Sequence, residues 1–306
     1  MAMQATTFRL GQLFVRAWLP EGEPKAVLRI IHGMAEHCGR YARLAEAFVQ
    51  QGWAVYAHDQ RGHGQTAPAE PELGHFADRD GFRLLISDAH DIALETARRH
   101  LGKKSVTFAH SMGSFVAQGV MLDHATDATA WILCGSSGRP GAIARVGRAL
   151  ARAERIRVGP REPSKVLDLA SFGPYNRHFA PNRTDFDWLS RDNAEVDKYI
   201  ADPLCGFSLT TQSWCDLLDA LDTFLHDPAL QRKIPATLPI LVTSGVDDPV
   251  GEMGDGDARL YVEYIRAGLS NTRLKLYSGA RHELVNETNR DEVTRDLLAF
   301  ASQAVA

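Results

Sequence analysis

The chain has 306 residues, of which 44% are hydrophobic and 24% charged, a composition typical of one large or two smaller globular domains. Its net charge of −4 argues against a general nucleic-acid binder, and no stretch approaches the roughly 18 consecutive apolar residues of a membrane span. The N-terminus lacks the layout of a signal peptide, and the four cysteines fit neither a zinc site nor a disulfide framework. We therefore expect a cytoplasmic protein.

Strands alternate with helices through residues 1–136. Short β-branched and aromatic runs predict the strands, and apolar residues at helical spacing predict the helices. In chain order the predicted elements are a hairpin at 8–19, a strand at 26–31, a helix at 41–51, a strand at 53–57, a helix at 80–101, a strand at 105–108, a helix at 114–122 and a strand at 129–134. This alternation predicts a parallel sheet with helices on both faces.

The alternation stops after residue 136 and resumes near residue 236. The predicted elements of the last part are strands at 238–243 and 272–277 and helices at 258–267 and 292–301. The stretch between is rich in Arg, Asp and aromatic residues and has no clear strands. We therefore expect an α/β core formed by residues 1–136 and 236–306, with residues 137–235 inserted as a mainly helical cap over the strand ends.

A serine stands where the strand at 105–108 turns into a helix. The turn reads Ala109-His110-Ser111-Met112-Gly113, which fits the G-x-S-x-G nucleophile elbow except that Ala109 replaces the first glycine. A serine at the apex of such a turn projects its hydroxyl away from the sheet, and the helix that follows directs free N–H groups toward a developing oxyanion. Ser111 is thus the predicted nucleophile.

The other two members of a triad follow later strands, in the chain order serine, acid, histidine that is typical of α/β hydrolases. His282 follows the strand at 272–277 and is the predicted general base. Two acids, Asp247 and Asp248, follow the strand at 238–243. We favour Asp248, because Pro249 biases its backbone to an extended conformation that fixes the carboxylate direction, and Asp247 remains the alternative.

An oxyanion hole needs two backbone N–H groups. One is expected from Met112, which follows the nucleophile, and the other from Met34, in the loop after the first core strand. Since both residues donate main-chain groups, their side chains matter less. In the same region we expect Glu36 and His37 to brace the loop of Met34.

Three motifs together resemble the monoacylglycerol lipase and lysophospholipase group of α/β hydrolases. They are His32-Gly-Met-Ala-Glu-His37 followed by Arg40-Tyr41, Asp59-Gln-Arg-Gly-His-Gly64, and His110-Ser-Met-Gly113. The resemblance implies an α/β-hydrolase fold with a mobile helical cap and an ester hydrolase without metal or cofactor. It also places the triad at Ser111, Asp248 and His282 and the oxyanion donors at Met34 and Met112.

The expected substrate is a small ester with an apolar acyl group, a monoacylglycerol or lysophospholipid. The same triad also suits a short-chain carboxylesterase, a peptidase or a thioesterase, and a non-catalytic relative that binds a small ligand is the alternative outside enzymes. No nucleic-acid partner is expected, and the sequence leaves the oligomeric state open. Asp59 and Arg61 are expected to fix their loop rather than contact substrate.

The cap begins with a basic amphipathic stretch at residues 141–157. Arg145, Arg148, Arg152 and Arg155 lie on one face, and Ile143, Val146 and Leu150 on another. Such a helix can lie on an anionic membrane surface, which would make the protein peripheral at the membrane. We favour the alternative of a cap helix with a solvated arginine face.

Overall fold

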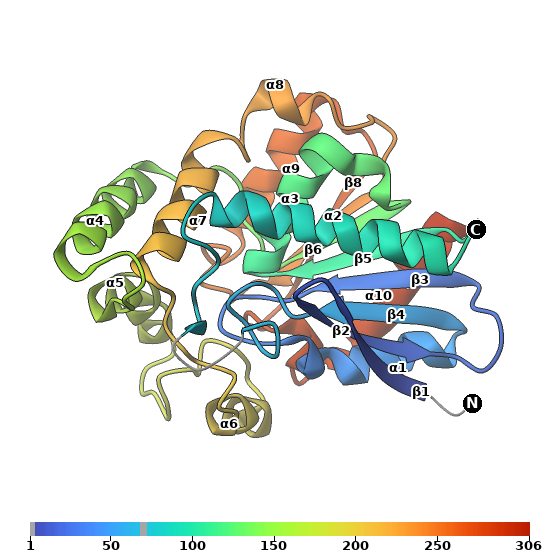
Figure 1. Ribbon diagram of the computed structural model, residues 1–306, viewed down its shortest axis with the longest axis horizontal. Coiled ribbons are helices and arrows are strands. Elements are labelled where there is room, and N and C mark those ends of the chain that lie inside the picture. Colours follow the sequence, from blue (N-terminus) through green and yellow to red (C-terminus); the bar gives the residue numbers. More distant parts are fainter. Residues whose placement is uncertain (1–3, 68–71) are drawn as a thin grey trace.

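A computed structural model describes residues 4–67 and 72–306 (Figure 1). Its strands form one sheet in the order β1-β2-β4-β3-β5-β6-β7-β8, which is antiparallel at β1–β2–β4 and parallel from β4 to β8. The strands are β1 (Gln4–Leu10), β2 (Leu13–Leu19), β3 (Ala26–Ile31), β4 (Trp53–His58), β5 (Ser105–His110), β6 (Ala130–Cys134), β7 (Ile240–Gly245) and β8 (Thr272–Tyr277). The expected mostly parallel sheet is confirmed.

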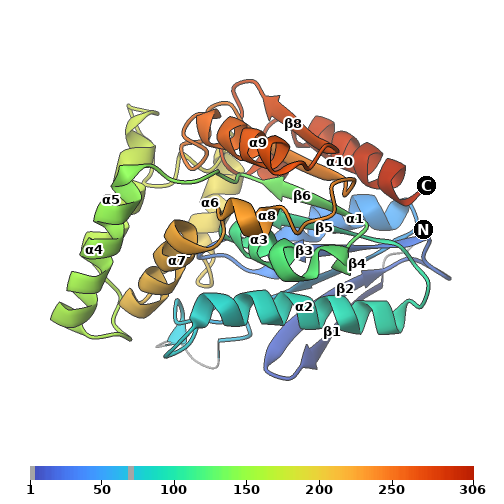
Figure 2. The same cartoon turned by 90° about the horizontal axis from the view of Figure 1, so that it is seen from above.

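Helices cover both faces of this sheet, as Figure 2 shows. One face packs against α2, α3 and α9 and the other against α1 and α10. Their bounds are α1 (Ala42–Gln50), α2 (Gly81–Arg99), α3 (Met112–His124), α9 (Asp255–Ala267) and α10 (Arg290–Val305). Strands β3, β4 and β6 are buried along their whole length, as expected for strands covered on both sides.

Between β6 and β7 the chain adds five helices, of which the first four lie at one end of the sheet (Figures 1 and 2), while the last packs against α9 of the core. They are α4 (Ala142–Val158), α5 (Lys165–Arg177), α6 (Asn193–Ala201), α7 (Thr211–Thr223) and α8 (Pro228–Gln231). Helix α4 packs against α5 and α7, and α7 also contacts α2 of the core. We call residues 137–235 the cap.

The arginine face of α4 is largely exposed, as predicted, since only Arg148 of its four arginines is half-buried, but part of this face also binds α7. Arg148 forms ion pairs with Asp219 and Asp222 of α7, and Arg152 pairs with Asp219 as well. Arg155 donates to Gln212 of the same helix at 2.5 Å. These arginines therefore face α7, because α7 presents two carboxylates one helical turn apart.

The apolar residues predicted for the other face of α4 differ in exposure, because Leu150 packs against the apolar core. Val146 is 66% exposed and Leu150 is half-buried, while the side chain of Ile143 lies outside the described part of the chain. Among the described residues, none of the helices combines the length and apolar character needed to cross a membrane.

Candidate active site

The strand–turn–helix around Ser111 has the geometry of a nucleophile elbow. Strand β5 ends at His110 and α3 begins at Met112, so Ser111 alone forms the turn, with φ +52° and ψ −125°. Its backbone N–H donates to the Cys134 carbonyl at 2.9 Å. A side chain at Gly113 would clash with the carbonyl oxygens of Ile31 and His32, so glycine is required for α3 to approach the loop after β3.

His282 and Asp248 form a buried pair. The Nδ1 atom of His282 lies 2.9 Å from Oδ2 of Asp248, and both residues are buried. Ser244 donates its hydroxyl to the same Oδ2, and the Val250 N–H donates to Oδ1, each at 2.9 Å. Asp247 is half-exposed and lies outside this pair, so the structure brings Asp248 rather than Asp247 to the imidazole.

Burial and charge act in opposite directions on this pair. Burial lowers the pKa of His282, but the charge of Asp248 and its hydrogen bond outweigh burial and raise that pKa above its usual value of 6.5. Burial raises the pKa of Asp248, but His282, Ser244 and the Val250 N–H outweigh it and hold that pKa below its usual value. The pair thus favours an ionised carboxylate that stabilises an imidazolium.

Ser111 and His282 both lie beside the end of β6. The elbow is bound to the Cys134 carbonyl, and a Cβ on the next residue, Gly135, would lie 3.0 Å from Cε1 of His282. The ring of His110 lies 4.6 Å from that of His282. In the described part of the chain the Ser111 hydroxyl forms no hydrogen bond with His282, a contact that often tightens only when substrate binds.

Among the described residues, the backbone N–H groups of Met34 and Met112, beside Ser111, have no acceptor. The N–H groups on either side of Met34 are both taken: that of Gly33 donates to Glu36 at 2.6 Å and that of Ala35 to Nε2 of His63 at 3.2 Å. Met112 opens α3, where N–H groups have no partner within the helix.

The loop of Met34 lies directly against the elbow. A Cβ on Gly33 would come within 3.0 Å of Cβ of Ser111, so glycine is needed for this close approach. Free N–H groups from two loops that meet at a serine can together stabilise an oxyanion.

Buried polar groups hold the Met34 loop in place. Glu36 accepts from the Gly33 N–H and the Tyr41 hydroxyl and pairs with Arg40. Arg40 also forms an ion pair with Glu283, the neighbour of His282 in the sequence. One polar network therefore joins the loops of Met34 and His282. The predicted bracing role of Glu36 is confirmed.

The Asp59–Gly64 loop is fixed as expected. Asp59 accepts from the Cys38 and Gln65 N–H groups at 2.8 and 2.7 Å, and Arg61 pairs with Asp88 of α2. Both side chains are therefore engaged within the protein.

His63 is a supporting residue that the sequence interpretation missed. Burial lowers the pKa of His63 to about 3, with a further contribution from His32, so the ring stays neutral at ordinary pH. It donates from Nδ1 to the Arg61 carbonyl and accepts the Ala35 N–H at Nε2. Its position within Gly62-His63-Gly64 was the available signal.

The cap covers His282 with aromatic residues. The predicted pattern of strands and helices did not show which cap residues would lie there. The ring of Trp188 lies 5.1 Å from that of His282, and Phe172 and Tyr175 pack against Trp188. The Glu283 N–H donates to the Leu189 carbonyl at 2.8 Å. An apolar aromatic wall therefore lies next to the imidazole.

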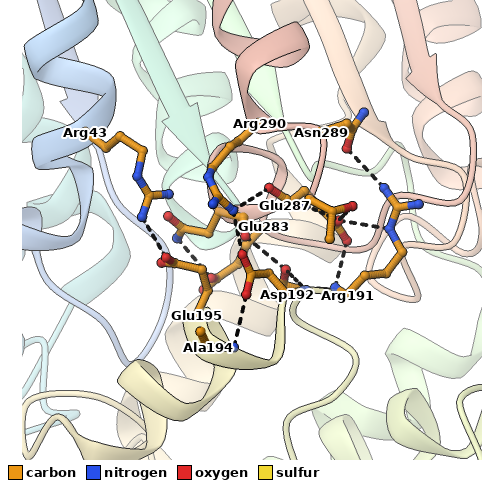
Figure 3. A network of polar contacts seen from close by, with 12 residues as sticks. Arg43, Arg191, Asp192, Ala194, Glu195, Glu283, Glu287, Asn289 and Arg290 are labelled. Carbon is orange, nitrogen blue, oxygen red and sulfur yellow. Dashed lines mark hydrogen bonds and ion pairs between the residues drawn. The ribbon is translucent and has the colours of Figure 1, made fainter.

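A dense polar network anchors this part of the cap to the core (Figure 3). Glu287 is buried and accepts from the backbone N–H groups of Arg191, Arg281 and Thr288 and from Nε of Arg191. The further pairs are Asp192 with Arg290 and Glu195 with Arg43. The start of α6 is thus fixed beside the loop that carries His282.

One cluster near the site has the composition of a metal site, formed by His37, Asp202 and Cys205. Nδ1 of His37 accepts the Gly39 N–H, so its ring proton resides on Nε2, which donates to Asp202 at 2.9 Å. A protonated Nε2 has no lone pair for a metal. The contact is therefore a hydrogen bond between the Met34 loop and the cap. A second cluster, His90, His124 and Asp127, joins α2 to the end of α3.

Comparisons with known proteins agree with this geometry. A family model described as serine aminopeptidase, S33 (Hydrolase_4) matches residues 22–289. Monoglyceride lipase of Homo sapiens is 29% identical over 96% of this chain and 88% of that protein, and monoacylglycerol lipase of Mycolicibacterium smegmatis is 27% identical over 92% and 90%. A thermostable carboxyl esterase from Bacillus coagulans superposes with a TM-score of 0.88 at 26% identity, covering both chains fully.

Proposed function

The chain belongs to the α/β-hydrolase family described as serine aminopeptidase, S33, and from that premise we propose that it cleaves esters of the monoacylglycerol or lysophospholipid type through an acyl-enzyme on Ser111. The observation that carries this proposal is the buried Asp248–His282 pair beside a serine in a strained turn. Such an arrangement activates a hydroxyl that is otherwise a weak nucleophile.

Each group has a defined role in the proposed reaction. His282 takes the proton of Ser111 as the hydroxyl attacks the ester carbonyl, and the N–H groups of Met34 and Met112 stabilise the oxyanion. His282 then protonates the leaving alcohol. Water, deprotonated by His282, releases the fatty acid and restores Ser111, while Asp248 orients the imidazole throughout.

Two observations support an ester with an apolar acyl chain. Two relatives are named monoglyceride lipase and monoacylglycerol lipase. The wall of Phe172, Tyr175 and Trp188 next to His282 also suits an acyl chain, because buried aromatic side chains favour apolar ligands.

The proposal is tested by Ser111→Ala, which removes the nucleophile. Hydrolysis of p-nitrophenyl esters should fall by a factor of about 10³ or more, because a triad without its nucleophile retains little activity. A fluorophosphonate probe should label the wild type at Ser111 only. Full ester turnover by the variant would contradict the assignment, and an unlabelled wild type would favour a non-catalytic, ligand-binding protein.

The catalytic acid is tested by a matched pair of neighbours. Asp248→Asn should lower kcat by about 10⁴, as expected when the imidazole loses the carboxylate that orients it. Asp247→Asn should leave kcat close to that of the wild type, because Asp247 is half-exposed and does not contact His282. The opposite pattern would assign the role to Asp247.

The leaving group and acyl length are distinguished by one substrate series. Rates are compared for monoacylglycerols and lysophospholipids of increasing chain length, short p-nitrophenyl esters, thioesters and aminopeptidase substrates. A preference for long-chain monoacylglycerol or lysophospholipid supports the proposal. A maximum at short esters, amides or thioesters would instead favour a carboxylesterase, a peptidase or a thioesterase.

We also propose that the cap contacts membrane surfaces through apolar residues rather than through its arginines. Ile156 of α4 is 85% exposed and Leu169 of α5 is 71% exposed, and these two helices pack together. Several of the α4 arginines are paired with α7 instead. Exposed apolar side chains on two helices that pack together are typical of interfacial contact.

Vesicle sedimentation tests this contact. Ile156→Asp together with Leu169→Asp should abolish binding to phosphatidylcholine–phosphatidylglycerol vesicles without lowering turnover of a soluble ester. Leu101→Asp is the control, because Leu101 is 82% exposed but follows the end of α2 away from the cap. If Leu101→Asp lost as much vesicle binding as the double variant, a contact specific to the cap would be contradicted.

A further inference from the structure

A second buried carboxyl group lies behind Asp248. Asp257, in the first turn of α9, is fully buried. Neither of its side-chain oxygens has a hydrogen-bond partner among the described residues. A side chain at Gly251 would clash with the Oδ2 atom of Asp257, so only glycine at position 251 leaves space for this carboxyl group. A buried carboxyl without a partner is uncommon and calls for an explanation.

Ser244 connects the two carboxyl groups. Its hydroxyl donates to Oδ2 of Asp248 at 2.9 Å, the same oxygen that faces Nδ1 of His282. Ser244 also faces Asp257. A hydroxyl has one hydrogen to donate but can also accept. Because Ser244 donates its hydrogen to Asp248, it can only accept a hydrogen bond from Asp257.

The surroundings of Asp257 favour its neutral form. The charge of Asp248, from the loop after β7, disfavours an ionised Asp257, whereas the Ser244 hydroxyl on β7 and the backbone N–H of Ser136 after β6 act on its pKa in the opposite direction. The thiol of Cys134 on β6 is close to both carboxyls, and burial followed by these charges raises its pKa. Burial first, and then the charge of Asp248, raise the pKa of Asp257 well above 3.8.

We propose that Asp257 is a positioning residue for catalysis: its protonated carboxyl donates to Ser244, which donates to Asp248, which holds His282. Each hydrogen in this series has one donor and one acceptor, and all point toward Asp248. The hydroxyl of Ser244 is thereby held in a single orientation, and Asp248 keeps its direction toward the imidazole. This inference rests on the proposed role of Asp248 and His282.

Two substitutions separate positioning from packing. Asp257→Leu removes the donor but fills the space, and should lower kcat about tenfold while KM stays within about twofold. Asp257→Asn keeps an N–H donor toward Ser244 and should retain kcat within about threefold of the wild type. Asp255→Leu and Asp255→Asn are the controls, because Asp255 is exposed in the same helical turn.

Two kinetic outcomes would overturn the proposal. Wild-type kcat in Asp257→Leu would show that the site only needs to be filled. Equal losses in Asp257→Leu and Asp257→Asn would show that an ionised carboxylate, rather than a donor, is required. A merely structural role would change the melting temperature and leave kcat unaffected.

The protonation state has its own test, independent of activity. Native Asp257 keeps its proton above pH 3.8, where the same group in the unfolded chain loses it, so wild-type stability falls as pH rises. Neither Asp257 variant has a carboxyl group here, so neither loses stability in this way as pH rises. The melting temperature of each variant minus that of the wild type should therefore be larger at pH 8 than at pH 5. If this difference in melting temperature did not change with pH, the proposal that Asp257 is protonated would be contradicted. If Ser111→Ala kept activity, the proposed function would fail, but this comparison would still decide the state of Asp257.

Discussion

Ser111 and Ala35 share a positive φ angle, which is uncommon for a residue other than glycine. Both have φ of +52°, and each is adjacent to a predicted oxyanion donor, since Ser111 precedes Met112 and Ala35 follows Met34. Such a conformation costs a non-glycine residue about 1–3 kcal/mol, and it persists only where surrounding contacts impose it. Here those contacts include the Cys134 carbonyl for Ser111 and His63 for Ala35.

The raised pKa of His282 predicts the pH dependence of turnover. The imidazole must be neutral to accept the Ser111 proton, so kcat/KM should increase with pH through an inflection above 6.5, the usual pKa of histidine. In Asp248→Asn the residual activity should show its inflection at lower pH, because the carboxylate that raises the pKa is gone. A wild-type inflection below 6.5 would contradict the pairing of these residues.

Gly33→Ala tests the close approach of the two loops. The new Cβ would lie 2.8 Å from Oε1 of Glu36 and 3.0 Å from Cβ of Ser111, so the Met34 loop must move. We expect kcat to fall by about 10²-fold, the usual effect of losing one oxyanion donor. Gly141→Ala, which meets nothing within 4 Å, should leave kcat unchanged, and equal effects would argue against a steric cause.

The sequence could identify residues that have a motif, and it missed those without one. Ser111 stands in a recognisable turn, and His282 follows a strand in the expected chain order. Asp257 belongs to no pattern, and nothing in the sequence singles out Trp188 among the aromatic residues of the cap. Asp257 matters through Ser244, thirteen positions earlier in the sequence, and Trp188 through a cap that folds back over the core. Such contacts depend on tertiary packing, which spacing along the chain does not encode.

At the scale of elements, periodicity located the strands and helices well and their ends less well. The strand predicted at 238–243 runs over Ile240–Gly245. Pro239 has no N–H to donate to a ladder, although its carbonyl accepts from Trp131. The helix predicted from residue 258 begins at Asp255. Its first turn contains Gly256 and follows Gly254, and glycine weakens the helical pattern.

Two glycines inside helices should respond oppositely to alanine. A Cβ on Gly147 of α4 would have only Leu218 within 4 Å, at 3.9 Å, so Gly147→Ala should stabilise the protein by about 0.5–1 kcal/mol through helix propensity. A Cβ on Gly119 of α3 would clash with Cδ1 of Ile86 on α2 and lie 2.8 Å from its Cγ1, so Gly119→Ala should destabilise the protein by forcing these helices apart. Melting temperatures measure both, and a decrease for Gly147→Ala would contradict the open environment of that site.

For the whole molecule, the cap is held by ionic and polar contacts between segments far apart in the sequence. Arg191 and Glu287, for example, are 96 positions apart. Their pairing follows from the docking of the cap and from no local preference. Composition therefore predicted an insertion, but the place where it rests on the core came only from the structure.

Glu287→Gln tests this anchorage (Figure 3). An amide nitrogen cannot accept, so at least one of the N–H groups now bound to Glu287 would lose its partner in a buried place. We expect a loss of about 2–4 kcal/mol and faster proteolysis within the cap. Glu292→Gln on α10 is the control because Glu292 is exposed, and equal protease resistance in both variants would contradict the anchor.

The carbonyl of Ala35 accepts two bonds from the cap, from the Tyr199 hydroxyl and from the Gly206 N–H, each at 3.0 Å. Grafting a foreign lid onto this scaffold to change its selectivity would therefore also disturb the loop that carries Met34. A chimera without a donor equivalent to Tyr199 should turn over every substrate more slowly, whatever its acyl length. In this enzyme the cap therefore affects the rate as well as the selectivity. A transplanted cap must supply donors equivalent to the Tyr199 hydroxyl and the Gly206 N–H.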